Sequence, residues 1–315
     1  MTARDVIITE FMNEAAVASL AADFAVLYDP TLVDGRDRLV AAVAEARAIV
    51  VRNRTVVDAA LLDAAPHLVV VGRLGVGLDN IDVPACTRRG VAVHPATGAN
   101  AAAVAEYVIT AILALTRRVL WSTEQVIDGS WPRTALKGGE VAGRTLGLVG
   151  LGTIAREVAV RAAALGMEVA AYDPFVPPED DIWQRVSRQS LDTLITDNDA
   201  ISIHVPLTEE TRHLIGPHNV TSMRPGVVLV NTARGGIVDD DAVVEALRSG
   251  HLGGAALDVF ADEPLSRDQG ARYANTPNLI LTPHIAGITT ESDVRVGEVT
   301  AAAVRRALQG GDDQR

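Results

Sequence analysis

Short β-branched runs alternate with alanine-rich helical stretches along most of this chain. Before residue 98, apolar runs such as "AIVV" (48–51) and "LVVVG" (68–72) alternate with helical patterns such as "NEAAVASLAA" (13–22). The alternation starts again at "TLGLVG" (145–150) and continues to "NLILTPH" (278–284). Continuous apolar strands between helices are typical of parallel sheets that helices cover on both faces. The pattern predicts an α/β fold of doubly wound parallel sheets.

Residues 100–131 break this alternation. The stretch "NAAAVAEYVITAILALTRRVLWSTEQVIDGSW" predicts one long helix and its continuation, with Asn100 as the N-cap. The chain has 315 residues, and a single hydrophobic core usually stops growing below that size. We therefore expect two domains, and this helix could bridge them.

Charge and cysteine content exclude several kinds of partner. The chain has 28 Lys and Arg residues against 40 Asp and Glu residues, a formal net charge of −12. A field of that sign repels nucleic acid and anionic membranes, so we expect neither as a partner. Cys86 is the single cysteine, which excludes an intrachain disulfide and indicates a reducing compartment. Because Asp5 and Glu10 stand where a signal peptide needs an apolar stretch, we expect a cytoplasmic protein.

The segment 145–175 has the form of a dinucleotide-binding fingerprint. An apolar strand enters Gly150-x-Gly152-x-x-Ala155, a helix follows, and a second strand ends at Asp173. Gly150 permits the tight turn, Gly152 lets the backbone approach a pyrophosphate, and the helix N-terminus attracts the phosphates. A carboxylate at Asp173 would bind ribose hydroxyls and repel the 2′-phosphate of NADP, so NAD is the expected cofactor. A glycine-rich turn without a ligand explains less of this pattern.

Six segments, one of them within the fingerprint, give the chain a resemblance to a known family along nearly its whole length. It resembles the D-isomer-specific 2-hydroxyacid dehydrogenases, which include phosphoglycerate, glycerate and hydroxypyruvate enzymes. The segments are "GRLGVGLDNID" (72–82), "GLVGLGTIAREVA" (147–159), "HVPLTEET" (204–211), "VNTARGGIVDDDAV" (230–243), "LDVFADEP" (257–264) and "LTPHIAG" (281–287). The resemblance implies a Rossmann NAD domain (98–287) inserted into a flavodoxin-like catalytic domain made from both chain ends (1–97 and 288–315).

The same resemblance implies a set of cofactor-binding residues and no metal ion. They are Gly150, Gly152, Thr153, Ile154, Asp173, His204, Val205, Pro206, Thr211, Thr232, Ala233, Asp258, His284 and Gly287. Of these, Asp258 matches the family acid that contacts the nicotinamide amide. Members of the family are usually dimers, so we expect a homodimer.

Hydride transfer at a 2-keto or 2-hydroxy carbon also needs a group that moves a proton, and histidine suits this near neutral pH. His94, His204 and His284 each follow an apolar strand, and spacing alone cannot choose among them. The resemblance assigns the role to His284, in "TPH". It assigns Glu263 as the carboxylate that fixes the tautomer of His284 and favours its protonated form. Asp262 is then a solvated neighbour.

An anionic substrate needs cations at the site. Arg234 follows a buried strand, where its planar donors suit a substrate carboxylate and the reacting carbonyl. The residues alone leave open a surface salt bridge to the acids at 239–240, and the resemblance favours catalysis. Gly75 and Val76 offer backbone N–H groups for the carboxylate. Arg52 resembles a residue that faces the distal end of the substrate, with an interdomain salt bridge as an equal alternative.

These features together predict a reaction class and leave the substrate open. We expect an NAD-dependent oxidoreductase that acts on a small 2-hydroxy or 2-keto acid with a polar or anionic 3-substituent, of the phosphoglycerate, glycerate/hydroxypyruvate or sulfolactate type. The alternative is an NAD-binding regulatory protein on the same scaffold without significant turnover. Glu263 argues against a formate-type enzyme. We expect no added C-terminal regulatory domain, and therefore no serine-pathway feedback in that form.

Overall fold

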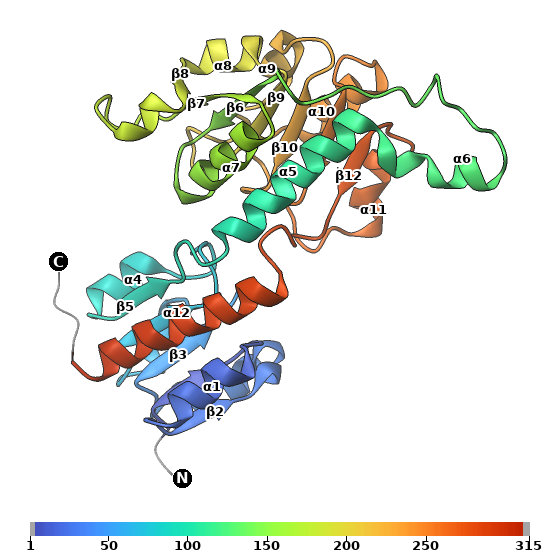
Figure 1. The fold of residues 1–315 in the computed structure, drawn as a ribbon. Helices are drawn as coiled ribbons and strands as arrows, with labels where there is room; N and C mark the ends of the chain where they lie inside the picture. Colours follow the sequence, from blue (N-terminus) through green and yellow to red (C-terminus); the bar gives the residue numbers. More distant parts are fainter. Residues whose placement is uncertain (1–3, 311–315) are drawn as a thin grey trace. The chain divides into compact units, whose positions relative to one another are not determined.

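The computed structural model describes residues 4–310, which form two compact units. Unit 1 holds the chain up to Asn100 and from Ile288 onward, and unit 2 holds Ala101–Gly287 (Figure 1). The chain therefore leaves unit 1 once and returns to it once. Each unit contains one parallel sheet, which confirms the predicted fold class.

Unit 1 is a five-stranded parallel sheet in the order β2-β1-β3-β4-β5. This is the flavodoxin-like order, in which the chain reverses direction across the sheet between β1 and β3. Its strands are β1 (Val6–Ile8), β2 (Val26–Tyr28), β3 (Ala48–Val51), β4 (Val70–Arg73) and β5 (Ala92–Pro95). Its helices are α1 (Glu14–Ala21), α2 (Arg36–Val43), α3 (Ala59–Asp63), α4 (Val83–Arg88) and α12 (Thr290–Leu308), with the 3-10 turn η1 (Pro30–Asp34).

Helix α12 completes unit 1 from the far end of the sequence. It lies beside α1 and over β4. A Cβ added at Gly297 would stand 2.9 Å from the Cβ of Ala16, and one at Gly72 would stand 2.7 Å from Val304. Only glycine permits these two approaches, so the C-terminal helix is matched to the N-terminal half of the unit.

Unit 2 is a seven-stranded parallel sheet in the order β12-β11-β10-β9-β6-β7-β8. Its strands are β6 (Thr145–Val149), β7 (Glu168–Tyr172), β8 (Ser187–Arg188), β9 (Ala200–Ile203), β10 (Val228–Asn231), β11 (Gly254–Leu257) and β12 (Leu279–Leu281). Its helices are α5 (Ala101–Arg117), α6 (Thr123–Ile127), α7 (Thr153–Ala164), α8 (Leu191–Asp197), α9 (Pro217–Ser222), α10 (Asp240–Arg248) and α11 (Arg267–Gly270), with 3-10 turns η2 (Val119–Trp121), η3 (Asp181–Gln184) and η4 (Ala271–Tyr273).

The strand order of unit 2 places its functional loops. Chain order reverses between β6 and β9, as in the Rossmann arrangement, where ligands bind beyond the carboxyl ends of the strands. Both faces of the sheet are covered, one by α5 and α7 and the other by helices that include α8 and α9. The central strands β9 and β10 are fully buried, which explains why they read as continuous apolar runs.

The prediction of one long helix over 100–131 was partly wrong. Helix α5 ends at Arg117, because Arg118 takes a left-handed backbone with φ of 55°, and the short elements η2 and α6 follow. The expected cap is also missing, since the buried Oδ1 of Asn100 has no hydrogen-bond partner among residues 4–310.

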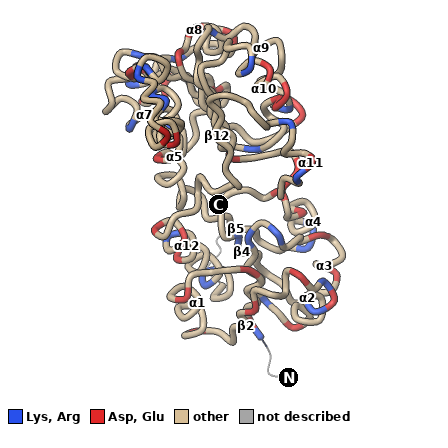
Figure 2. Tube along the Cα trace, turned by 90° about the vertical axis from the view of Figure 1, so that its right-hand side faces the viewer, with Lys and Arg blue, Asp and Glu red and all other residues tan. Residues whose placement is uncertain are grey.

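In the sequence, the acids at 239–241, Arg248 and Gly250 predict a helix with an acidic start and a basic end, and the structure confirms it. Asp239 caps α10 by accepting the Ala242 N–H, Arg248 lies in the last turn, and Gly250 follows with φ of 76°. The acidic start of α10 is visible in Figure 2, and it complements the positive end of the helix dipole. Within residues 4–310, no helix is long and apolar enough to cross a membrane, and no cluster of potential ligands could hold a metal ion.

Candidate active site

The fingerprint turn after β6 is built around Gly150. Its φ of 89° lies in the left-handed region, and an added Cβ would stand 2.7 Å from the carbonyl oxygen of His204. Its N–H donates to the carbonyl of Tyr172 at 2.8 Å. Another residue at position 150 would therefore strain the backbone and push the loop after β9 away.

Gly152 leaves the N-terminus of α7 open. It is the N-cap, no side chain caps the helix, and an added Cβ would meet no atom within 4 Å. The N–H groups of Thr153 and Ile154 lie in this first turn, where a helix has unsatisfied donors and a partial positive charge. An open, glycine-lined helix start of this kind fits a pyrophosphate.

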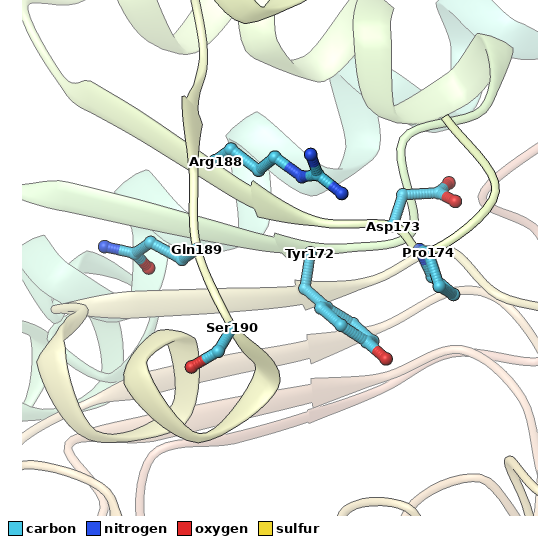
Figure 3. A pocket seen from close by; sticks show the side chains of 6 residues that line it. All are labelled: Tyr172, Asp173, Pro174, Arg188, Gln189 and Ser190. Carbon is cyan, nitrogen blue, oxygen red and sulfur yellow. The ribbon is translucent and has the colours of Figure 1, made fainter. Parts of the chain in front are cut away.

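Asp173 lies just beyond the end of β7 and is fixed by two backbone donors. One carboxylate oxygen accepts the N–H of Leu151 at 2.8 Å, and the other accepts the N–H of Phe175 at 2.8 Å. The first bond joins the acid to the fingerprint turn itself. A pocket of about 410 Å³ opens beside it (Figure 3), lined by Tyr172, Asp173, Pro174, Arg188, Gln189 and Ser190. This volume lies within the general range of small-molecule sites, and the lining includes a carboxylate and a guanidinium.

The loop after β9 carries four of the expected cofactor residues, His204, Val205, Pro206 and Thr211. Nε2 of His204 lies 2.9 Å from the Ser202 hydroxyl, and burial lowers the pKa of His204 to about 4. The ring is therefore neutral near pH 7, which rules it out as the proton donor for ketone reduction. The Thr211 hydroxyl donates to the carbonyl of Pro206 at 2.6 Å and so holds this loop closed.

His284 and Glu263 form the pair that the resemblance implies. Nδ1 of His284 lies 2.7 Å from Oε2 of Glu263, and the other carboxylate oxygen accepts the N–H of Phe260 at 2.9 Å. The side chains are 42% and 31% exposed, so the pair is open to small molecules. Because the carboxylate takes Nδ1–H, Nε2 is the atom left to exchange a proton with a ligand.

Asp258 fixes the loop that carries His284. Its carboxylate is fully buried and accepts the N–H groups of Ile285 and Ala286, each at 2.8 Å, and the hydroxyl of Thr282 at 2.5 Å. The backbone carbonyl of Asp258 accepts the N–H of His284 at 2.8 Å, and His284 itself has a left-handed backbone with φ of 56°. The resemblance implies a nicotinamide contact for Asp258, and these hydrogen bonds show that it also holds the His284 loop.

The Thr282 hydroxyl also ties the His284 loop to helix α5. It lies 2.6 Å from the hydroxyl of Tyr107, whose pKa burial raises. Gly287 ends this loop and is the last residue of unit 2.

Arg234 lies three residues beyond β10 in a turn that Asn231 brackets. Oδ1 of Asn231 accepts the N–H of Ala233 at 3.0 Å, and its Nδ2 donates to the carbonyl of Arg234 at 3.0 Å. Of the two acids at 239–240, Asp239 caps α10 and Asp240 accepts the Tyr273 hydroxyl. Thr232, expected to contact the cofactor, has a buried hydroxyl without a partner in the described part of the chain.

The Arg234 turn lies against the loop that carries Glu263. A Cβ added at Gly235 would stand only 1.9 Å from the carbonyl carbon of Phe260. The strands β10, β11 and β12 are neighbours in the sheet, so the loops that follow them share one edge. Unit 2 alone therefore brings together the three expected catalytic residues.

In unit 1, Arg52 follows β3 and is held from three sides. Its guanidinium donates to Asp293 on α12 at 2.8 Å and stands 5.9 Å from the ring centre of Phe11. The predicted alternative was an interdomain salt bridge, but Asp293 belongs to the same unit. The backbone N–H of Arg52 donates to the side chain of Glu10. Glu10 is only 5% exposed and also accepts the N–H groups of Arg54 and Thr55.

The expected carboxylate cradle after β4 is only half available. The N–H of Gly75 donates to the carbonyl of Arg73 at 2.8 Å within a tight turn, where Gly75 has φ of 142°. It is therefore occupied in this conformation. The N–H of Val76 makes no hydrogen bond within residues 4–310 and remains a donor for a substrate carboxylate.

Sequence reasoning missed Glu10 and Asn231, whose side chains bind loop backbone. Both stand at strand ends, β1 and β10, where α/β folds place functional groups. That position was the available signal, but neither residue carries a motif of its own.

Known proteins that resemble this chain agree on one family. The family model described as "D-isomer specific 2-hydroxyacid dehydrogenase, NAD binding domain" matches residues 109–286. The (S)-sulfolactate dehydrogenase of Chromohalobacter salexigens is 56% identical over 305 residues, which cover 96% of this chain and 98% of that protein. The D-3-phosphoglycerate dehydrogenase of Mycobacterium leprae is 42% identical over 97% of this chain, which spans 57% of its length. The TT0316 protein of Thermus thermophilus, a solved structure, matches with a TM-score of 0.87, 32% identity and 99% of each chain.

Proposed function

The chain belongs to the D-isomer specific 2-hydroxyacid dehydrogenase family, and we propose that its substrate pair is sulfolactate and sulfopyruvate. It is an NAD-dependent oxidoreductase that transfers a hydride between nicotinamide and a small 2-hydroxy or 2-keto acid. One observation carries the choice of substrate: the 56% identity with an (S)-sulfolactate dehydrogenase extends over 96% of this chain. The phosphoglycerate dehydrogenase of Mycobacterium leprae is less similar, at 42% identity.

The residues of unit 2 fit NAD and suggest how it is held. The N–H groups at the start of α7 take the pyrophosphate, and Asp173 takes the adenosine ribose. When bound, the cofactor supplies or accepts the hydride at C2 of the substrate. Thr232, Ala233 and Asp258 stand at the strand ends nearest the reacting groups and are proposed to orient its nicotinamide.

Arg234 is proposed to bind the substrate carboxylate and polarise the reacting carbonyl. A guanidinium offers two parallel donors to a carboxylate. Donors aimed at the oxygen stabilise negative charge as it develops during reduction. The bracket that Asn231 forms around the turn keeps this side chain in place for both tasks.

His284 is proposed to donate a proton from Nε2 to the substrate oxygen during reduction, and to accept it during oxidation. Glu263 binds Nδ1 at 2.7 Å, which fixes the tautomer and the orientation of the ring. The hydrogen bonds from Asp258 to the 285–286 backbone hold the ring where the proton is needed.

Arg52 is proposed to recognise the sulfonate on C3, and the N–H of Val76 to bind the substrate carboxylate. The salt bridge to Asp293 and the Phe11 ring orient the guanidinium, and its remaining N–H groups suit a tetrahedral anion. One charge-assisted hydrogen bond contributes about 1.5–3 kcal/mol, which is roughly 10- to 100-fold in binding.

A panel of keto acids tests this function. NADH oxidation is followed with 3-sulfopyruvate, 3-phosphohydroxypyruvate, hydroxypyruvate and glyoxylate, and we expect the highest kcat/KM with 3-sulfopyruvate. Arg52→Ala should lower kcat/KM for 3-sulfopyruvate by roughly 10- to 100-fold and leave glyoxylate nearly unchanged. Arg54→Ala removes an equal charge from the same loop, where Arg54 pairs with exposed Asp34, and serves as the control. Equal rates with all four acids, or equal effects of both variants, would contradict the proposal.

The protein is also proposed to form a homodimer through the segment after α5. The elements η2 and α6 and the chain that follows project from the sheet of unit 2 (Figure 1). Ile127 and Trp131 there are 80% and 64% exposed, and clustered exposed apolar side chains mark association surfaces. Light scattering after size exclusion should give twice the chain mass, and Ile127→Lys should shift it toward the monomer.

The regulatory alternative has no support among the relatives, which are named dehydrogenases and reductases. Measurable turnover with any 2-keto acid would exclude it. The cytoplasmic location stays a prediction, which cell fractionation would test.

A further inference from the structure

The pocket beside Asp173 is lined by charges of both signs. Asp173 follows β7, and Arg188 ends the neighbouring strand β8, where it pairs in register with Ala171. Because paired residues of neighbouring strands point to the same face of the sheet, Arg188 points to the same face as Ala171. In Figure 3 the Arg188 guanidinium extends across the pocket toward the side on which Asp173 lies.

The Arg188 guanidinium has no carboxylate partner within residues 4–310. It stands 5.6 Å from the ring centre of Trp183, which restrains its orientation without neutralising its charge. The neighbouring Arg156 differs, because Asp180 binds it at 3.0 Å. The pocket thus holds a positive charge that structural ion pairing does not use.

Asp173, on the other side of the pocket, is held in place by two hydrogen bonds. The N–H groups of Leu151 and Phe175 each hold one oxygen of Asp173. A phosphate on the adenosine 2′-oxygen would therefore meet a fixed negative charge from Asp173 and a positive charge from Arg188. Binding of NADP(H) depends on the balance of these two groups, while NAD(H) places no phosphate there.

We propose that Arg188 is a second determinant of cofactor choice, a cation that attracts the 2′-phosphate of NADP(H) while Asp173 repels it. The preference for NAD then rests on the charge of Asp173 alone. Removing that charge turns Arg188 into the anchor of the phosphate. The inference concerns the cofactor pocket only, and holds whichever keto acid is the substrate.

A double-mutant cycle tests the assignment by binding, without turnover. Kd values for NADH and NADPH are measured by nucleotide fluorescence for the wild type, Asp173→Asn, Arg188→Gln and the double variant. Asp173→Asn removes the charge and keeps a carbonyl oxygen as acceptor for one of the two N–H groups. Arg185→Gln, an exposed arginine that does not line the pocket, is the matched charge control.

We expect Asp173→Asn to raise the affinity for NADPH relative to NADH by about tenfold or more, and Arg188→Gln to remove most of that gain. In the wild-type background, Arg188→Gln should lower the same ratio by about tenfold, and Arg185→Gln should leave it unchanged. The Kd of Asp173→Asn for NADPH should also rise more steeply with salt than that of the double variant.

Two results would overturn the assignment. One is an equal affinity for NADPH in Asp173→Asn and the double variant. The other is an equal loss of NADH and NADPH affinity in Arg188→Gln, which would mean that Arg188 serves the shared adenosine and not the phosphate. If Asp173→Asn binds neither nucleotide, the single variant Arg188→Gln still decides. Failure of the sulfopyruvate proposal would change none of these values.

Discussion

Gly235 offers a sharp test of how the catalytic residues are held together. It follows Arg234 directly, and an added Cβ would stand 1.9 Å from the carbonyl carbon of Phe260 and 2.3 Å from the nitrogen of Ala261. Ordinary van der Waals contact begins near 3.4 Å, so Gly235→Ala must separate the two segments by about 1.5 Å. The atoms in the way are backbone, and no flexible side chain can yield.

The two segments can separate by a shift of position 235 or by a shift of Phe260, and either shift displaces a catalytic group. A shift of position 235 carries Arg234 with it, and a shift of Phe260 pulls on Glu263 through the N–H bond of 2.9 Å. Misplacing a reacting group by 1 Å costs about 100-fold in rate, so kcat should fall by about 100-fold or more. Overpacking should also lower the free energy of unfolding by about 1–3 kcal/mol.

The neighbouring glycine is the matched control. Gly236 has φ of 80°, and a Cβ there would meet nothing closer than 3.8 Å. Gly236→Ala therefore carries backbone strain of about 1 kcal/mol without a collision, and kcat should stay within about threefold. NADH oxidation gives kcat, and urea unfolding gives stability. A Gly235→Ala enzyme with kcat within threefold of the wild type would refute the reasoning, as would equal losses of kcat in both variants.

Two other predictions concern histidines. His284→Ala should lower kcat by about 100- to 10,000-fold while the Kd for NADH, measured by fluorescence, stays nearly constant; a parallel loss of NADH binding would make His284 structural. Burial lowers the pKa of His204 from 6.5 to about 4, so the folded state resists protonation that the unfolded state accepts. Its contribution to stability is complete above pH 6.5 and declines toward pH 4, by about 1–3 kcal/mol over that window. Urea unfolding of the wild type and His204→Asn should show a smaller decline in the variant, and equal declines would contradict the assignment.

Much of the fold could be predicted from local sequence, because apolar periodicity reports burial directly. The strands β3 and β6 are buried and were predicted close to their observed bounds. Helix α10 was predicted from its acidic start and the glycine after it. The break at Arg118 could not be foreseen, because no glycine or proline marks the position of its left-handed backbone.

Local sequence could not show which of the three histidines at strand ends transfers the proton. His94, His204 and His284 have similar surroundings in the sequence, and the resemblance was needed to select the third. The structure supplies a physical reason: a carboxylate lies 2.7 Å from His284, whereas burial holds the pKa of His204 near 4. Partners 21 residues apart in the chain leave no periodic signal.

Glu10 and Asp258 also have partners that local sequence could not reveal. A buried carboxylate is costly unless several donors satisfy it, and each of these two accepts three hydrogen bonds from loop atoms. The donors to Glu10 lie 42 to 45 residues away, so the acid and the Arg52 loop specify each other's position only in the folded chain. Satisfying Glu10 requires one conformation of the loop that carries Arg52, and satisfying Asp258 requires one conformation of the loop that carries His284. Two buried acids therefore orient anion recognition and proton transfer: Glu10, which lies outside the motif segments, and Asp258, which lies within one of them. Substitutions at either should alter selectivity or rate before they alter the fold.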